Sequence, residues 1–326
     1  MFGPLVVCYL FLGGAGAGAL FVSSALALLS PADAVSQPAL RRRGGGVRMV
    51  VELPQPYRLL VAPGAAAGLV ALGAGVTCLL ADVGRADRVG LLLANPAFTY
   101  VAAGTWALVA CSGLGAALLA AWTGCVRLSL TAVRVLEVAL LAAAFVVMVY
   151  TGLLLRDMAA VPLWATPWLP ALFALSSLSC GTALVLAAGQ FSGAARLFGR
   201  VFRRLAFADA VAIILEILVA AAYVAVVLGV ALPGAVSVPE DSGTLEALAA
   251  SAQALTAGSA AWAFWGVFAV GGLAVPLALD AAFARGRAAL KPRAVLAASA
   301  CVLAGGLALR YCVVEAGLHP VLQTMM

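Results

Sequence analysis

The sequence predicts an all-α membrane protein whose chain crosses the lipid bilayer eight times. Hydrophobic residues make up 65% of its 326 residues and charged residues only 10%, whereas a soluble domain carries about a quarter charged residues. The mean hydropathy of +1.13 is correspondingly high. A chain this apolar needs lipid as the solvent for much of its surface. The apolar residues also gather in long continuous runs, each long enough for one span.

These runs predict eight helical spans within a single domain, residues 1–326, because a helix needs about 20 apolar residues to cross the hydrocarbon core. Membrane strands are excluded, since they show shorter segments of alternating polarity, and a helix satisfies its own backbone in lipid. We expect two packed four-helix bundles. The predicted spans are residues 4–30, 58–81, 98–122, 130–155, 166–190, 207–232, 260–283 and 292–316.

The first span begins in MFGPLVVCYLFLGG, which has no basic residue and no convincing cleavage site after its apolar run. We therefore expect a retained span and not a signal peptide. Its stretch GGAGAGAL, residues 13–20, gathers small residues that allow another helix to approach the backbone closely. A groove for a flat ligand is the alternative interpretation.

Several polar residues lie inside the later spans, where a charge is costly and is a functional hypothesis by default. They are Glu137, Tyr150 and Thr151 in span 4, Asp209 and Glu216 in span 6, Asp280 at the end of span 7, and Arg310, Tyr311 and Glu315 in span 8. Asp209 and Glu216 are seven residues apart and share one helical face. Two interpretations stay open: buried pairing, as between Glu216 and Arg310, or a proton path through Glu137, Asp209, Glu216, Arg310 and Glu315.

The basic residues predict the orientation of the spans. Fifteen of the 19 Lys and Arg residues fall in or beside the loops after spans 1, 3, 5 and 7, and only Arg85, Arg88 and Arg156 fall on the side of the termini. Loops rich in Lys and Arg stay in the cytoplasm. We therefore expect a multi-pass protein of the cell membrane with both termini outside, on the periplasmic side. This topology explains the net charge of +6, so the charge indicates no nucleic-acid partner.

The stretch VYTGLLLRDMAAVPLWATPWLP, residues 149–170, places several polar and aromatic residues together where span 4 ends and span 5 begins. On the predicted topology it faces outward, as does the acidic loop VPEDSGTLEAL. Anchoring at the membrane interface accounts for tryptophans at such helix ends, and the rim of a binding site is the alternative. The tryptophans concerned are Trp164, Trp168, Trp262 and Trp265.

Other residue types limit the chemistry. None of the seven cysteines forms a C-x-x-C pair, so neither a zinc site nor a cysteine-ligated iron–sulfur cluster is indicated. The single histidine, His319, cannot supply both axial ligands of a bis-histidine haem. No P-loop and no nucleophile elbow with a histidine partner is present. We expect no haem, no metal and no catalytic residue of the usual kinds on this chain.

Three stretches resemble the NrfD/PsrC-type integral membrane subunit of molybdopterin oxidoreductase complexes, as in polysulfide reductase. They are YLFLGGAGAGAL in span 1, LLADVGRADRVGLLLANPAFTYVAAGTWAL at residues 79–108 and YTGLLLRDMAAVPLWATPWLPALFALSSLSCGTAL at residues 150–184, and LRYCVVEAG is also similar. The stretch at residues 79–108 resembles the family's D-x-G-R…R…N-P-x-F-T…G-x-W element. The stretch at residues 150–184 gives the most specific resemblance to the family. The resemblance covers nearly the whole chain.

The resemblance implies a quinol-binding anchor in membrane lipid. Such an anchor passes electrons between menaquinone or ubiquinone and a four-cluster iron–sulfur subunit on the outer face, which serves a molybdopterin catalytic subunit. The tyrosine of the family's Y-T-G element binds the quinone and falls here on Tyr150, and a polar residue near the start of span 1 falls on Tyr9. Asp82, Arg85 and Asp157 complete the expected site. The family's histidine and asparagine in this region have no obvious equivalents in this chain.

The residue types suit this chemistry, because a phenol is a neutral hydrogen-bonding group for a quinone oxygen and a nearby carboxylate accepts protons. The chain would then be the site of quinol oxidation or quinone reduction without holding the catalytic centre of the complex. A proton-coupled secondary transporter is an alternative, although no internal repeat of the transporter kind is evident. A purely structural anchor is another. The sequence leaves open the terminal substrate, the direction of electron flow, the quinone type, proton translocation and the oligomeric state.

Overall fold

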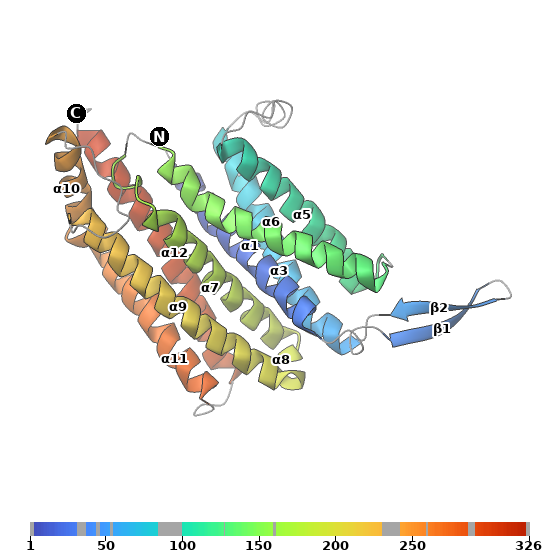
Figure 1. The fold of residues 1–326 in the computed structure, drawn as a ribbon. Coiled ribbons are helices and arrows are strands. Elements are labelled where there is room, and N and C mark those ends of the chain that lie inside the picture. The colour runs from blue at the N-terminus through green and yellow to red at the C-terminus, as the bar shows by residue number, and fades with distance from the viewer. Residues whose placement is uncertain are drawn as a thin grey trace.

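A computed structural model describes residues 3–30, 37–43, 46–52, 55–83, 100–126, 128–158, 161–229, 242–258, 260–285 and 291–323 (Figure 1). Eight helices in these ranges are long and apolar enough to cross a membrane. The all-α class with eight spans is therefore confirmed. The spanning elements are α1 (Pro4–Leu29), α3 (Gln55–Val83), α5 (Tyr100–Thr123), α6 (Leu130–Arg156), α7 (Trp168–Phe191), α9 (Gly199–Val227), η1 with α11 (Ala263–Ala274 and Val275–Ala284) and α12 (Pro292–Gln323).

Three features outside the spans were not predicted. Strands β1 (Gln37–Arg43) and β2 (Gly46–Glu52) form an antiparallel hairpin between α1 and α3, with Gln37 opposite Glu52 and Arg43 opposite Gly46. The short helix α8 (Ala194–Leu197) joins α7 to α9, and α10 (Ser242–Thr256) precedes η1. In Figure 1 the hairpin projects away from the helices. It therefore leaves the architecture of the membrane-spanning part unchanged.

Helices α1 and α7 form the centre of the molecule. Helix α1 packs against α3, α6, α7 and α12, while α7 also contacts α3, α6, α9 and α12. The four helices α1, α3, α5 and α6 contact one another in a ring, as do α7, α9, η1 with α11, and α12. Because α7 packs on three members of the first ring, the division into two four-helix bundles stays a prediction.

The small residues of α1 serve this packing. A methyl group added at Gly16 would lie 2.5 Å from the backbone nitrogen of Leu72 on α3, and one added at Gly18 would overlap the carbonyl oxygen of Ser177 on α7. No side chain larger than hydrogen fits such contacts between helix backbones. Of the two interpretations of GGAGAGAL, the structure therefore supports helix packing at Gly16 and Gly18.

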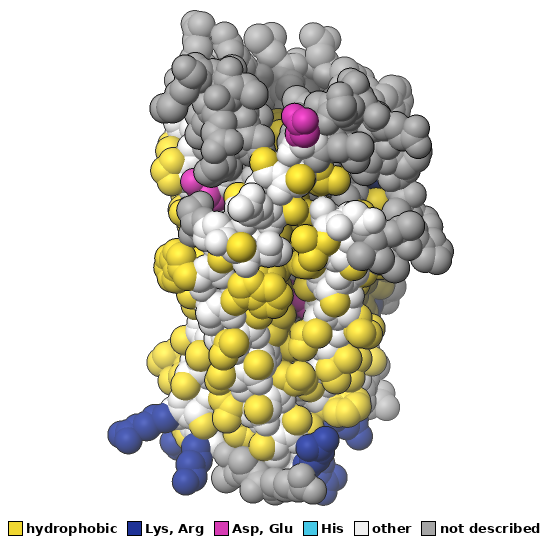
Figure 2. Space-filling view, turned by 90° about the vertical axis from the view of Figure 1, so that its left-hand side faces the viewer, with side chains coloured by type: hydrophobic (Ala, Val, Ile, Leu, Met, Phe, Trp, Pro, Cys, Tyr) yellow, Lys and Arg dark blue, Asp and Glu magenta, His cyan; other side chains and the backbone are white. Residues whose placement is uncertain are grey.

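The surface matches a protein that crosses a bilayer. Large apolar side chains such as Val70, Phe145, Phe207 and Leu218 are exposed on the spanning helices. Figure 2 shows hydrophobic side chains over the middle of the molecule and Lys and Arg at one end. Both termini lie at the opposite end in Figure 1. The chain is thus a multi-pass membrane protein, and which end faces the cytoplasm stays a prediction.

Trp164 does not lie at a lipid interface, contrary to the explanation offered for the outer tryptophans. It is 1% exposed, and its indole nitrogen donates a hydrogen bond of 2.9 Å to the carbonyl of Val313 on α12. Its ring packs against Gly317 so closely that an added methyl group there would lie 2.5 Å from it. Trp164 therefore fastens the turn before α7 to α12, whereas Trp262 and Trp265, 70% and 50% exposed, fit interfacial anchoring.

Candidate functional site

The feature that most resembles a ligand site is a pair of buried tyrosines, Tyr9 on α1 and Tyr150 on α6. They are 0% and 6% exposed. The two phenol groups interact with each other, and the Tyr9 hydroxyl meets the strict distance and angle of a hydrogen bond with no described residue. A buried hydroxyl whose hydrogen bonding is incomplete is unusual and requires an explanation. A ligand oxygen placed between the helices would provide one.

Small residues make room for both rings. A methyl group added at Gly104 on α5 would overlap the ring of Tyr150, and one added at Gly13 would lie 3.5 Å from the ring of Tyr9. Beside Tyr150, the Thr151 hydroxyl donates to the carbonyl of Met148, at 2.8 Å, so its hydrogen is already used. The pair therefore presents phenol oxygens in an otherwise apolar setting, which is the usual composition of a small-molecule site.

The predicted carboxylates lie nearer to water than the tyrosines. Asp82, at the end of α3, and Asp157, which caps α6, are both exposed. A methyl group added at Gly3 would lie 3.3 Å from Oδ1 of Asp82, which places that carboxylate beside the start of α1. At about 1.5 Å per helical residue, Asp157 lies about 10 Å from Tyr150 along α6. Both acids mark the end of the molecule that carries the tyrosine pair, and Arg85 lies outside the described residues.

A second polar group surrounds Arg310 on α12, which is 0% exposed. Its five N–H groups are matched by five hydrogen bonds. Nε donates to the carbonyl of Leu10 at 3.2 Å. Nη1 donates to the Ser176 hydroxyl at 3.0 Å and to the Gly306 carbonyl at 2.8 Å. Nη2 donates to the Ser177 hydroxyl at 2.8 Å and to the Phe173 carbonyl at 3.4 Å. The guanidinium also lies over the rings of Phe11 and Phe173.

Glu216 on α9 belongs to the same group, but none of the five hydrogen bonds of Arg310 goes to it. The two charges interact at a distance, and the Ser176 hydroxyl interacts with the Glu216 carboxyl while it accepts from Arg310. The predicted pairing of Glu216 with Arg310 thus takes an indirect form through Ser176. The sequence signal for this was LSSLSC, residues 175–180, whose hydroxyls break an otherwise apolar span.

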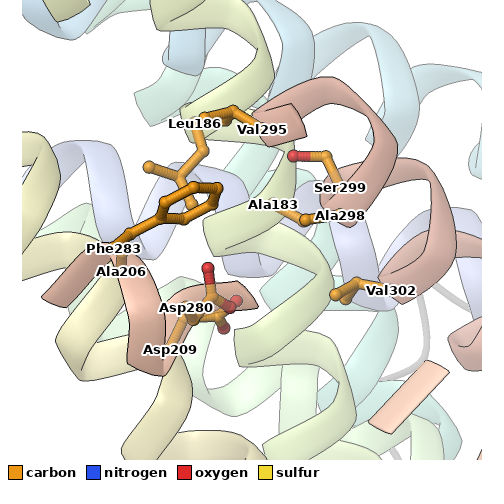
Figure 3. Close-up of a pocket in the computed structure, with 10 residues that line it drawn as sticks. All are labelled: Ala183, Leu186, Ala206, Asp209, Asp280, Phe283, Val295, Ala298, Ser299 and Val302. Carbon is orange, nitrogen blue, oxygen red and sulfur yellow. The ribbon is translucent and has the colours of Figure 1, made fainter. Parts of the chain in front are cut away.

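A third polar group lies where α9 and α11 meet. The carboxyl groups of Asp209 and Asp280 interact directly, and Ser179 on α7 interacts with Asp209. Both acids line a cavity of about 10 Å³. Figure 3 shows them side by side, with Ser299 of α12 among the other lining residues. The sequence pattern does not connect Asp280 with Asp209, because the two are 71 positions apart in the chain.

Two residues predicted for a proton path lie apart from these groups. Glu137 is 2% exposed and accepts a hydrogen bond of 2.7 Å from the indole of Trp122 on α5. Ser24 and Arg134 also act on its carboxyl group. Glu315, partly exposed, lines an apolar groove between α1, η1 and α12. The structure therefore brings Asp209, Glu216 and Arg310 into one region and places Glu137 and Glu315 elsewhere.

The sequence profile of the family described as "Polysulphide reductase, NrfD" matches residues 1–321. The match covers α1 through nearly all of α12, and so includes both tyrosines, Arg310 and the two aspartates. No curated protein sequence matches this chain.

Proposed function

Because this chain belongs to the NrfD family of polysulphide reductase membrane subunits, we propose that it binds a quinone at Tyr9 and Tyr150 and exchanges electrons with an iron–sulfur subunit. NrfD subunits of molybdopterin oxidoreductases are generally quinone-interacting anchors, and the family associates with iron–sulfur and molybdopterin subunits. The observation that carries the proposal is the buried pair itself: the phenols of Tyr9 and Tyr150 interact with each other from different helices, in an otherwise apolar setting.

The residues at the pair fit a quinone head group. When bound, a quinol supplies the electrons and protons of the reaction. The phenol of Tyr9 can donate to a ring oxygen, and the phenol of Tyr150 can donate or accept. Gly13 and Gly104 have no side chain and so make room for the two tyrosine rings. Tyr9 and Tyr150 would therefore orient the ring by hydrogen bonds in an otherwise apolar setting.

Protons leave this site toward the water boundary. Asp82 and Asp157 are exposed carboxylates at the same end of the molecule, and a carboxylate near the bound ring can accept a proton that a phenol has relayed. We propose that this end faces the periplasm, as the distribution of basic residues predicts. The four-cluster iron–sulfur subunit and, beyond it, the molybdopterin subunit would dock here.

Proton translocation is a further part of the proposal. Proton translocation is supported by the proximity of Arg310 to the tyrosine pair and to the carboxyl groups of Glu216 and Asp209. Arg310 donates to the carbonyl of Leu10, the residue after Tyr9, and shares Ser176 with Glu216. Glu216 in turn acts electrostatically on Asp209. The carboxyl groups of Glu216 and Asp209 would carry protons between the quinone site and the arginine-rich end, beside Arg310, which stays charged, while Glu137 and Glu315 lie outside this line.

The test is quinone-analogue binding and quinol-linked turnover by the purified complex carrying Tyr150→Phe or Tyr9→Phe. Each change removes one hydroxyl and keeps the ring, so we expect affinity to fall by roughly tenfold, the equivalent of about one hydrogen bond. Tyr311→Phe is the matched control, because Tyr311 is 44% exposed on α12. If Tyr150→Phe and Tyr9→Phe both kept normal quinone-analogue binding and normal turnover, a purely structural anchor would be the better interpretation.

A further inference from the structure

The polar group at Asp209 and Asp280 has an unusual composition for the interior of a membrane protein. Both acids are buried, at 1% and 3% exposed, and they come from different helices, α9 and α11. The groups that act most strongly on Asp209 are Asp280, Ser179 and Glu216, none of which is basic. Two adjacent carboxylates without a basic partner cannot both stay ionised in a low-dielectric setting unless a cation joins them.

A shared proton accounts for only part of the geometry. It would join the two carboxyl groups, and Ser179 interacts with Asp209, but the Ser299 hydroxyl would remain without a hydrogen-bond partner among the described residues. Ser299 is 4% exposed. Asp209 and Ser299 also line the cavity. A buried hydroxyl without a partner, at a cavity that two carboxyl groups also line, requires an explanation.

The size and charge of the site define that occupant. The cavity measures about 10 Å³, which is about the space that one water-sized particle needs. Carboxylate and hydroxyl oxygens are the ligands of hard cations. Ca²⁺ takes six to eight oxygen ligands and Mg²⁺ usually keeps several waters, and a cavity of this size has no room for either shell. One monovalent cation, together with one proton on the carboxyl pair, neutralises both acids.

We propose that Asp209, Asp280, Ser179 and Ser299 form a binding site for a small monovalent metal cation, with Na⁺ as the fitting ion. The site lies near the arginine-rich end, since Asp280 precedes Arg285, at the end of α11, by five residues. Four elements, α7, α9, α11 and α12, each contribute one oxygen-bearing side chain. Binding would therefore tie the second ring of helices together. It does not depend on the proposed quinone function.

The test measures Na⁺ directly on the purified full-length chain without quinone. We expect saturable binding of radioactive Na⁺, and a thermal unfolding midpoint that rises when NaCl replaces choline chloride at constant ionic strength, because choline is too large for the cavity. Protons compete for the same carboxylates, so the Na⁺ effect should be larger at pH 8 than at pH 6. Asp280→Asn should weaken Na⁺ binding by at least about tenfold.

Two further variants make the result decisive. Ser299→Ala keeps both carboxyl groups and removes one neutral ligand, so it should weaken Na⁺ binding even if Asp280→Asn fails to fold. Glu246→Gln, an exposed acid on α10, should leave the Na⁺ response unchanged. An unfolding midpoint that is equal in NaCl and choline chloride at both pH values would overturn the proposal. A midpoint that depends on pH but not on Na⁺ would also overturn it and would assign the site to a proton or a water molecule.

Discussion

Arg310 on α12 donates a hydrogen bond of 3.2 Å to the backbone carbonyl of Leu10 on α1. This bond joins residues 300 positions apart and connects the buried guanidinium to the residue that follows Tyr9. A guanidinium in a membrane interior is stable only if its donors are satisfied, and here each N–H group has an acceptor. The contact therefore links the two rings of helices at the proposed quinone site.

Arg310→Lys should destabilise the protein even though it keeps the charge. Lysine offers three donors where Arg310 uses five, so buried acceptors such as the Phe173 carbonyl and the Ser177 hydroxyl lose their partner. At about 1–3 kcal/mol for each buried group left unsatisfied, we expect the free energy of unfolding to fall by about 2–4 kcal/mol. Chemical unfolding in mild detergent measures this. Arg156→Lys, at an exposed position, is the control, and equal stability of the two variants would contradict the prediction.

Gly104→Ala should impair the tyrosine pair, because the added methyl group would overlap the ring of Tyr150. Overpacking of this kind shifts side chains and costs about 1–3 kcal/mol. We expect quinone-analogue affinity to fall by about tenfold or more. Gly113→Ala lies on the same helix and meets open space, so it should leave binding unchanged. Normal binding in Gly104→Ala would show that the position of the Tyr150 ring is not critical.

Glu137→Gln should lower stability and leave proton transfer unchanged, since Glu137 lies between Trp122, Ser24 and Arg134 and apart from Arg310. Trp122→Phe, which removes the donor of the 2.7 Å hydrogen bond, should lower the free energy of unfolding by about 1–3 kcal/mol. Glu216→Gln is the comparison and should reduce proton uptake by the reconstituted complex. If Glu137→Gln abolished proton uptake at normal stability, Glu137 would belong to the path after all.

The orientation can be tested with native Cys125, which is exposed beyond the end of α5 at the arginine-rich end. In intact cells a membrane-impermeant maleimide should not label Cys125, because basic loops remain in the cytoplasm. Met158→Cys, at an exposed position after α6, should be labelled in a background where the native cysteines are replaced by serine. Permeabilised cells provide the control, in which both positions react. The opposite labelling pattern would reverse the proposed topology.

Composition and the length of the continuous apolar runs were enough to predict the spans. The run at 130–155 became α6, Leu130–Arg156, and the run at 260–283 became η1 with α11, Ala263–Ala284. Such predictions succeed because the bilayer imposes a minimum length and an apolar composition on each helix separately. The sequence also pointed to Tyr9 and Tyr150, which the structure brings together from α1 and α6. Their role with a quinone remains a proposal.

Contacts between distant helices depend on the packed structure. The partners of Arg310, the meeting of Asp209 with Asp280, and the separation of Glu137 from both follow from how the helices are arranged around α1 and α7. The same holds for Trp164, which has the sequence context of an interfacial anchor but lies buried against Val313. Hydropathy and charge are properties of one segment at a time, whereas these contacts depend on the rotation and depth of two or more helices. Side-chain packing and small residues such as Gly18 determine that rotation and depth together.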